Sequence, residues 1–384
     1  MTKKQLVLLS ICNLVPWTVG TGLVPLLPVY ASQFGVSSKG VGYYLALAYL
    51  ALTAGTLLAG WLSDRFQRRK MLLVAAGLLM IPAIWMMGLA TDIWQLSVFS
   101  AAVWFLGGVQ ITIVNIQIGL FSEKSKRGMA FGFLGMTPAL GSLIGGLASG
   151  PLVDNQGYGT MFAVFAIFSV VLPLAAMYST DKITKRKDRD QKLPAKRKVK
   201  PSPVIFLLVV SFTIVEIAVF ISNMGRSMAM NKLGFLSVAI SSTAAISGAV
   251  KLPFPLLLGW LSDRIGRKRI MVICYFMRSM ALIVLIFSVS LWHFWIYAIL
   301  ISLGSISRSV GAAFLTDLVP PESLGLGMSL YKAGNFVGGI IGFACAGVLM
   351  QNLGMTTTLV MSSFLPIIAI AMLIRVRESV RDAR

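Results

Sequence analysis

One segment of eleven residues occurs twice in this chain. The segment Gly60–Lys70, with the sequence GWLSDRFQRRK, returns as Gly259–Arg269, with the sequence GWLSDRIGRKR, at an offset of 199 residues. The same offset aligns Gly35 with Gly234. Because this register holds over half the chain, the sequence predicts two duplicated halves.

The composition requires lipid as the solvent for most of the chain. Of 384 residues, 57% are hydrophobic and 12% are charged, which leaves more apolar surface than the core of a soluble domain can bury. A membrane-spanning helix needs about 20 mostly apolar residues, and the sequence predicts an all-α integral membrane protein with twelve such helices. The apolar runs lie near 5–31, 39–62, 70–90, 94–121, 128–151, 158–179, 203–230, 236–260, 270–291, 294–318, 324–350 and 355–376.

The basic residues indicate which helix ends face the cytoplasm. The formal net charge is +21, and most Lys and Arg residues fall in alternate short loops, as expected of cytoplasmic loops. This pattern places both termini in the cytoplasm of a cell-membrane protein and favours contact with anionic lipid headgroups over nucleic acid. Residues 180–202 carry ten Lys or Arg against three Asp. They form the predicted cytoplasmic linker between an N-terminal six-helix bundle, 1–179, and a C-terminal one, 203–384.

The duplicated segment resembles the loop between helices 2 and 3 of the major facilitator superfamily, and its counterpart between helices 8 and 9. The resemblance implies two pseudo-symmetric six-helix bundles. It also implies that Asp64 bridges to the opposite half and locks the outward-facing state. The alternative is that the segment is only a basic anchor at the membrane surface. The predicted gating residues are Gly60, Asp64, Arg65 and Arg68 in the first copy, and Gly259, Asp263, Arg264 and Arg267 in the second.

Ionisable residues at membrane depth indicate function because each is costly there. In the second half of the chain, Glu216 is the carboxyl group that lies well inside the membrane. Lys251 and Arg308 lie at similar depth. Either Glu216 titrates during transport, or it is a permanent counter-ion for one of these cations. Thr213 and Asn223 share its helical stripe, and Pro253 is expected to interrupt the helix beside Lys251.

The first half offers polar rather than ionisable groups at membrane depth. They lie close to one face of helix 1 and one face of helix 4, as expected of a substrate pathway. The predicted residues are Asn13, Trp17, Gln110 and Gln117.

Resemblances to individual branches of the superfamily are partial. Gly141-Ser-Leu-Ile-Gly-Gly146 is similar to the helix 5 signature of the antiporter branch, with Ser142 in place of proline. Gly22-Leu-Val-Pro-Leu-Leu-Pro-Val-Tyr30 is similar to helix 1 of drug and metabolite exporters. The arginine that proton-coupled exporters carry in helix 4 is replaced by Trp104.

These observations predict a monomeric secondary transporter that exports a small, partly apolar molecule, coupled to protons, by alternating access. Uptake or exchange of an organic anion is the first alternative, favoured by the cationic second half. A transport-inactive receptor or lipid-interaction protein of the same fold is the second. No clustered nucleophile and base or metal-ligand set is evident, so an enzyme is not expected. No cofactor is expected, and no ATP-binding Gly-x-x-x-x-Gly-Lys loop is present.

Overall fold

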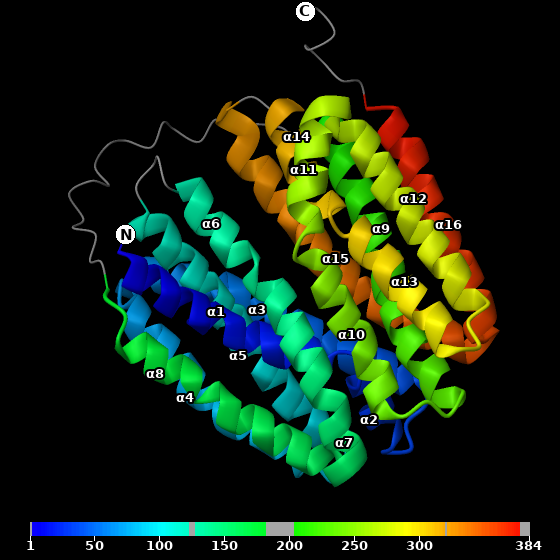
Figure 1. The fold of residues 1–384 in the computed structure, drawn as a ribbon, viewed down its shortest axis with the longest axis horizontal. Helices are drawn as coiled ribbons and strands as arrows, with labels where there is room; N and C mark the ends of the chain where they lie inside the picture. The colour runs from blue at the N-terminus through cyan, green and yellow to red at the C-terminus, as the bar shows by residue number, and fades with distance from the viewer. Residues whose placement is uncertain (1, 123–126, 182–202, 319–320, 377–384) are drawn as a thin grey trace, which may run out of the picture. The chain divides into compact units, whose positions relative to one another are not determined.

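The computed structural model describes residues 2–122, 127–181, 203–318 and 321–376, and every regular element within these ranges is an α-helix. The helices form two compact units (Figure 1). The first comprises Met1–Asp188 with Met230–Ala249, and the second Arg189–Ala229 with Val250–Arg384. The predicted linker falls almost wholly on 182–202, outside the described residues.

The first unit contains eight helices from the first half of the chain and one from the second. They are α1 (Lys3–Leu23), α2 (Leu27–Ser32), α3 (Ser38–Phe66), α4 (Arg69–Gly88), α5 (Ile93–Phe121), α6 (Arg127–Gly135), α7 (Thr137–Ser169), α8 (Val171–Met177) and α10 (Ser237–Lys251). The last two residues of α10, Val250 and Lys251, belong to the second unit.

The second unit is built from the other helices that follow the linker. They are α9 (Pro203–Lys232), α11 (Phe254–Ile265), α12 (Arg267–Ile286), α13 (Leu291–Gly304), α14 (Ser307–Leu318), α15 (Pro321–Leu353) and α16 (Met355–Ile374).

In the described part of the chain, ten helical segments have the length and hydropathy to cross a membrane. One of them, Met129–Met177, holds two predicted spans, because Gly157 adopts a φ of 83° and turns the chain within α7. The eighth predicted span is divided into α10 and α11, which end and begin on either side of Leu252-Pro253. These two features reconcile ten segments with twelve spans, and the all-α membrane fold is confirmed.

Short polar residues fix where several helices begin. The side chain of Ser37 accepts a hydrogen bond from the Gly40 amide at the start of α3, and Asp92 accepts one from Gln95 at the start of α5. Such N-caps satisfy amides that have no partner within the helix. At α13, Ser290 and His293 form a reciprocal capping box, so the single histidine of the chain has a structural contact.

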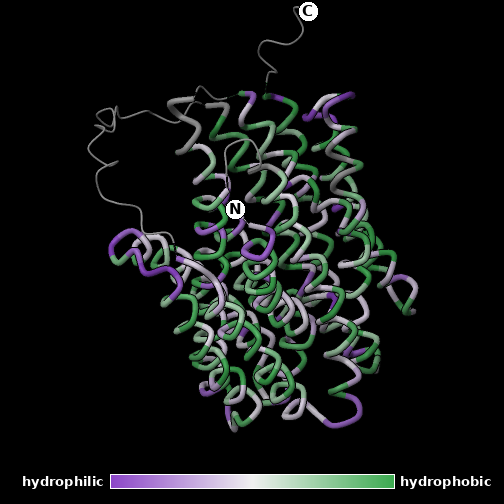
Figure 2. The backbone as a smooth tube through the Cα atoms, turned by 60° about the vertical axis from the view of Figure 1, so that its left-hand side comes forward, coloured by the Kyte–Doolittle hydropathy of each residue, from purple (hydrophilic) through white to green (hydrophobic). Residues whose placement is uncertain are grey.

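The apolar surface is distributed as a lipid-embedded protein requires. Hydrophobic residues follow most of the length of the helices, and hydrophilic ones gather mainly at turns (Figure 2). Large apolar side chains also point outward, with Leu57 at 71% and Ile167 at 65% exposure. A soluble protein would bury much of this surface, whereas lipid solvates it at no comparable cost.

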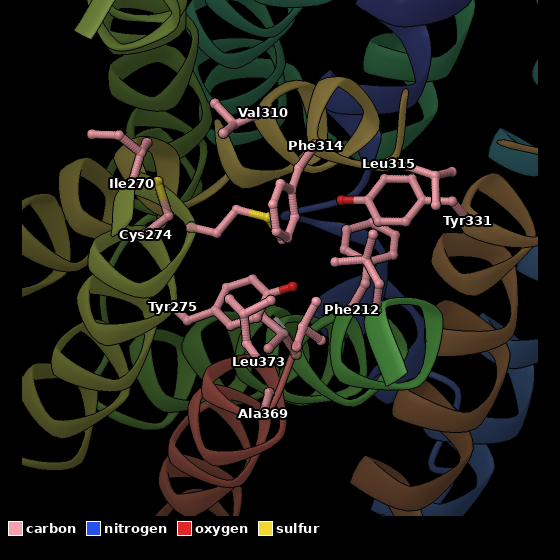
Figure 3. Packing of buried hydrophobic residues seen from close by; sticks show 14 of the residues in the cluster. Phe212, Ile270, Cys274, Tyr275, Val310, Phe314, Leu315, Tyr331, Ala369 and Leu373 are labelled. Atoms are coloured by element: carbon pink, nitrogen blue, oxygen red, sulfur yellow. The ribbon is translucent and has the colours of Figure 1, made fainter. Parts of the chain in front are cut away.

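The core of the second unit packs aromatic and sulfur-containing side chains from several helices. Phe212 of α9 stacks on Tyr331 of α15, with ring centroids 4.2 Å apart, and Cys274 and Tyr275 of α12 lie in the same cluster (Figure 3). Tyr331 also donates a hydrogen bond to the Ser307 carbonyl of α14. This core fixes the positions of α9, α12, α14 and α15, the helices that carry the charged residues described next.

Candidate functional site

Glu216 lies at the centre of a charged cluster in the second unit. Its side chain is 0% exposed. Oε1 accepts from Nη1 of Arg278 at 2.8 Å and from Nε of Arg308 at 3.1 Å. Oε2 accepts from Nη2 of Arg308 at 2.5 Å and from Nδ2 of Asn335 at 2.9 Å. These four residues, the Glu216 cluster, come from α9, α12, α14 and α15.

Glycines on α15 allow this helix to approach α9 beside Glu216. A Cβ atom added at Gly338 would lie 2.6 Å from the Glu216 Cβ, and one at Gly334 would lie 2.6 Å from the Thr213 hydroxyl. Gly342 continues the same contact one turn further on, against Ile217. The four-residue spacing places these glycines on one helix face, where small residues permit close backbone approach.

Arg278 and Asn335 are the members of the cluster that were not predicted as site residues. An arginine near the cytoplasmic boundary can extend its side chain to the surface, but Arg278 is 0% exposed and paired with Glu216. Gly304 of α13 makes room for it, since a Cβ there would lie 2.5 Å from the Arg278 Cγ. One feature of the sequence could have indicated Asn335: it directly follows Gly334, which belongs to the glycine face.

The two predicted partners of Glu216 differ in the structure. Arg308 makes a bidentate contact with the carboxylate, and its side chain is 43% exposed. Lys251, at the last position of α10, is partly buried. Within the described residues, however, the Lys251 ammonium forms no ion pair.

The other predicted residues of α9 bond within their own helix. The Thr213 hydroxyl donates to the Val209 carbonyl at 2.8 Å, and the Asn223 carbonyl accepts from the Ser227 hydroxyl at 3.3 Å. Both side chains are partly buried on the stripe that includes Glu216. They are therefore neighbours of the Glu216 cluster along α9 without being hydrogen-bonded members of it.

The polar residues predicted in the first half point to different helices. Asn13 donates to the Thr137 hydroxyl of α7 at 2.6 Å, whereas Gln110 donates to the Ala76 carbonyl of α4 at 3.0 Å. Trp17 is partly buried, and its carbonyl accepts from the Thr21 hydroxyl.

Gln117 differs from these three residues. It is fully buried, and neither atom of its amide has a partner among the described residues. The structure therefore does not join the predicted polar residues of the first half into one hydrogen-bonded site.

The first copy of the duplicated segment turns on an unusual backbone. Among the described residues, Gln67 is the one residue other than glycine with a positive φ, 54°. Arg69 donates from Nε to the Ser63 hydroxyl at 2.8 Å, which ties the two sides of the turn together. Asp64 and Arg68 are exposed, and Arg65 lies over the Trp61 ring at 5.5 Å.

The second copy carries an ionic network. Arg267 contacts Asp263 at 3.4 Å and Asp317 of α14 at 2.9 Å, and it also donates to the Ala313 carbonyl. Arg264 lies over the Trp260 ring at 4.0 Å. Gly259 lies within α11, ahead of these charged residues. In each copy an arginine therefore joins neighbouring helices: Arg69 contacts a hydroxyl across the first turn, and Arg267 contacts carboxylates at the second.

Comparisons with known proteins agree with this architecture. The multidrug resistance protein MdtG of Citrobacter koseri is 27% identical over 334 residues, covering 83% of this chain and 78% of the relative. MdtG of Serratia proteamaculans is 26% identical over 343 residues, covering 84% and 82%.

Solved structures with low sequence identity share the fold. A mutant of the nucleoside transporter NupG superposes with a TM-score of 0.80 at 13% identity, covering 97% of this chain and 99% of that one. A bacterial homologue of the human lysosomal transporter Spinster superposes with a TM-score of 0.74 at 16% identity, covering 97% of each chain. The family profile of the Major Facilitator Superfamily matches residues 6–250 and 215–384. The chain therefore belongs to the Major Facilitator Superfamily, a family of multi-pass membrane transporters of small molecules.

Proposed function

We propose that this chain is a secondary active exporter that moves a small, partly apolar organic molecule out of the cell in exchange for protons. Its two bundles, 1–179 and 203–384, alternate access to a site near the middle of the membrane. The basic segment 180–202 and both termini lie on the cytoplasmic side, next to anionic lipid headgroups. The transporter works as a monomer.

The Glu216 cluster is the observation that supports the proposed coupling to protons. A carboxylate at membrane depth is costly unless cations and hydrogen-bond donors compensate it. Arg278, Arg308 and Asn335 provide that compensation. Protonation of Glu216 would remove its charge and weaken both ion pairs. One proton would thereby change how α9, α12, α14 and α15 are held together.

The duplicated segment supplies the gate in this proposal. Gly60, Asp64, Arg65 and Arg68 act around the turn from α3 to α4. Gly259, Asp263, Arg264 and Arg267 act around the turn from α11 to α12. Because the chain passes directly from one membrane helix to the next at both turns, a change in their contacts would move two helices together. The two MdtG relatives are named as multidrug resistance proteins, which supports export as the direction of transport.

Uptake or exchange of an organic anion is a second candidate. The observation that favours it is the excess of cationic side chains over carboxylates in the described membrane-embedded part of the second unit: Arg226, Lys251, Arg278 and Arg308 against Glu216. Such an excess would attract a solute that brings its own negative charge.

Flux through the purified protein in liposomes tests these proposals. Carboxyfluorescein, Nile red and ethidium serve as anionic, neutral and cationic probes, each measured with and without an imposed pH gradient. Export requires accumulation that follows the gradient and disappears with Glu216→Gln. Downhill exchange of the anionic probe alone, insensitive to pH, would support the second candidate. An absence of flux for every probe, with binding retained, would favour a transport-inactive receptor.

A further inference from the structure

A row of one leucine, one tryptophan and one arginine lies near the end of the helix that enters each duplicated turn. Spacings of three and four residues place the members of a row on one helix face. The same offset of 199 residues relates the two rows, so they occupy equivalent positions in the two halves of the chain. These Leu-Trp-Arg rows are Leu58, Trp61 and Arg65 of α3, and Leu257, Trp260 and Arg264 of α11.

The apolar members of both rows are open to the surroundings of the protein. Trp61 is 55% exposed and Trp260 is 56% exposed, and Leu257 is 56% exposed. Lipid chains solvate exposed apolar side chains of a membrane helix, and tryptophan is enriched at the level of the lipid headgroups. Toward the end of its helix, each row therefore offers a contact for an acyl chain, then an interfacial ring, then a cation.

The arginine of each row lies over the ring of its tryptophan. The guanidinium carbon is 5.5 Å from the ring centre in the Arg65–Trp61 pair and 4.0 Å in the Arg264–Trp260 pair. Both arginines are exposed, and within the described residues neither forms a hydrogen bond or an ion pair. The carboxylate next to Arg264, that of Asp263, contacts Arg267 instead. Stacking uses the face of a guanidinium and leaves the N–H groups at its edge available to an acceptor.

Exposed tryptophans at other helix ends lack such an arginine. Trp94, near the start of α5, is 78% exposed, and Trp292, near the start of α13, is 69% exposed. The five residues on either side of each contain no Lys or Arg. A helix C-terminus favours a cation, which accounts for an arginine there but not for the exposed ring beneath it. The combination of ring and cation is thus a property of the duplicated segment.

We propose that each Leu-Trp-Arg row binds one phospholipid with an anionic headgroup. The arginine donates charge-assisted hydrogen bonds to the phosphate, the indole ring lies beside the glycerol backbone, and the leucine contacts an acyl chain. A zwitterionic lipid carries its own ammonium group, which offsets the phosphate charge, so the row selects phosphatidylglycerol over phosphatidylcholine. The duplication provides two such sites, one on each unit, and neither depends on the proposed transport function.

Tryptophan fluorescence tests the proposal. Four variants of the full chain each retain one tryptophan, Trp61, Trp260, Trp94 or Trp292, and carry phenylalanine in place of the others. Each variant is placed in nanodiscs that contain phosphatidylcholine and phosphatidylglycerol, and only one of the two lipids carries brominated acyl chains, which quench fluorescence at short range. The ratio of quenching by the two brominated mixtures gives the local preference for phosphatidylglycerol.

We expect this preference to be about three- to fivefold at Trp61 and Trp260, which is the contribution of one cation near an anionic headgroup. At Trp94 and Trp292 it should be absent, because no cation accompanies those rings. An equal preference at all four tryptophans, or none at any of them, would overturn the proposal.

Arg264→Gln is the critical variant, and Arg269→Gln is its matched control. Arg269 is exposed and lies in the first turn of α12, in the same copy of the segment, but it is not stacked on a ring in the described structure. Arg264→Gln should reduce the preference at Trp260 to that at Trp292, whereas Arg269→Gln should leave at least about half of it. Equal losses would show that the preference comes from the general basic charge of the turn, and would refute the site. Arg65→Gln is the corresponding test in the first copy.

Two further measurements exclude a soluble ligand and a folding defect. Glycerol 3-phosphate in the buffer should leave the preference at Trp260 unchanged, and its loss would assign the arginine to a soluble phosphate compound instead of a lipid. If removal of the other tryptophans prevents folding, native mass spectrometry counts the phosphatidylglycerol molecules that remain bound to the wild-type chain and to the double variant Arg65→Gln/Arg264→Gln. The wild-type chain should retain more of them, and equal retention would contradict the proposal.

Discussion

Asp154 of α7 caps the first turn of α10 across a helix–helix contact, with Oδ1 accepting from the Ser237 amide at 2.9 Å. Its Oδ2 accepts from the Val238 amide at 2.7 Å. The contact joins a residue of the first sequence repeat to a helix of the second. Ser142 extends it toward the membrane interior by donating to the Ala244 carbonyl at 2.8 Å. α10 therefore receives its N-cap from a neighbouring helix instead of from its own flanking sequence.

Asp154→Ala should release the end of α10 from α7. The loss of a helix cap costs about 0.5–2 kcal/mol. In a background without Cys12, Cys274 and Cys345, a disulfide between Ser142→Cys and Ala244→Cys should form less readily when Asp154 is replaced. Asp92→Ala is the control, because Asp92 caps its own helix, α5, by a bond of 2.8 Å. Equal cross-linking with and without Asp154 would contradict the assigned role.

Asp64→Asn should shift the protein toward the inward-open state if the first copy of the duplicated segment acts as a gate. One charged contact is worth on the order of 1–3 kcal/mol, enough to move a balanced equilibrium about fivefold or more. Distances between spin labels on the cytoplasmic ends of α3 and α15 would report the shift. Asp263→Asn is the corresponding variant in the second copy. Asp263 is exposed, and its contact with Arg267 is a long one, 3.4 Å. Unchanged distances in Asp64→Asn would leave the segment as a membrane-surface anchor.

Gln67→Gly should stabilise the turn after α3. Gln67 holds a left-handed φ of 54°, which costs a residue with a side chain about 1–2 kcal/mol and costs glycine almost nothing. The aligned residue Gly266, with a φ of 101°, provides the reciprocal experiment, in which Gly266→Ala should destabilise the protein. Thermal unfolding measures both. A lower melting temperature in Gln67→Gly would show that the side chain of Gln67 is needed for more than the turn.

The sequence predicted features that depend on local patterns better than it predicted contacts between distant residues. The interruption at Pro253 follows from residue chemistry, and it occurs between α10 and α11. Whether the Arg278 side chain is buried depends on how α12 is rotated about its own axis in the packed structure. The position of a residue along the helix axis does not give this rotation. Its burial could therefore not be predicted from its depth, and Arg278 is fully buried in the structure.

Gly338→Ala should disturb the Glu216 cluster without removing any of its charged groups. The new methyl carbon would lie 2.6 Å from the Glu216 Cβ, so α15 or Glu216 must shift, at a cost of about 1–3 kcal/mol. Gly327→Ala on the same helix is the matched control, because its nearest atoms, on Leu315, lie at ordinary contact distances from 3.4 Å. Equal melting temperatures and equal pH-driven flux in the two variants would argue against close packing at Gly338.

Glu216→Gln should destabilise the protein, because it leaves Arg278 buried without its carboxylate. Breaking a buried pair from one side costs about 3–5 kcal/mol, whereas removing both charges is often nearly neutral. Arg278→Met in the same chain should therefore restore most of the lost stability. Lys251→Met should restore less, since Lys251 makes no ion pair with Glu216 within the described residues. Thermal unfolding ranks these variants, and pH-driven flux separates structure from coupling. A stable double variant that still accumulates substrate along a pH gradient would remove Glu216 from the coupling mechanism. A stable double variant that binds and exchanges substrate without accumulation would assign the coupling proton to Glu216.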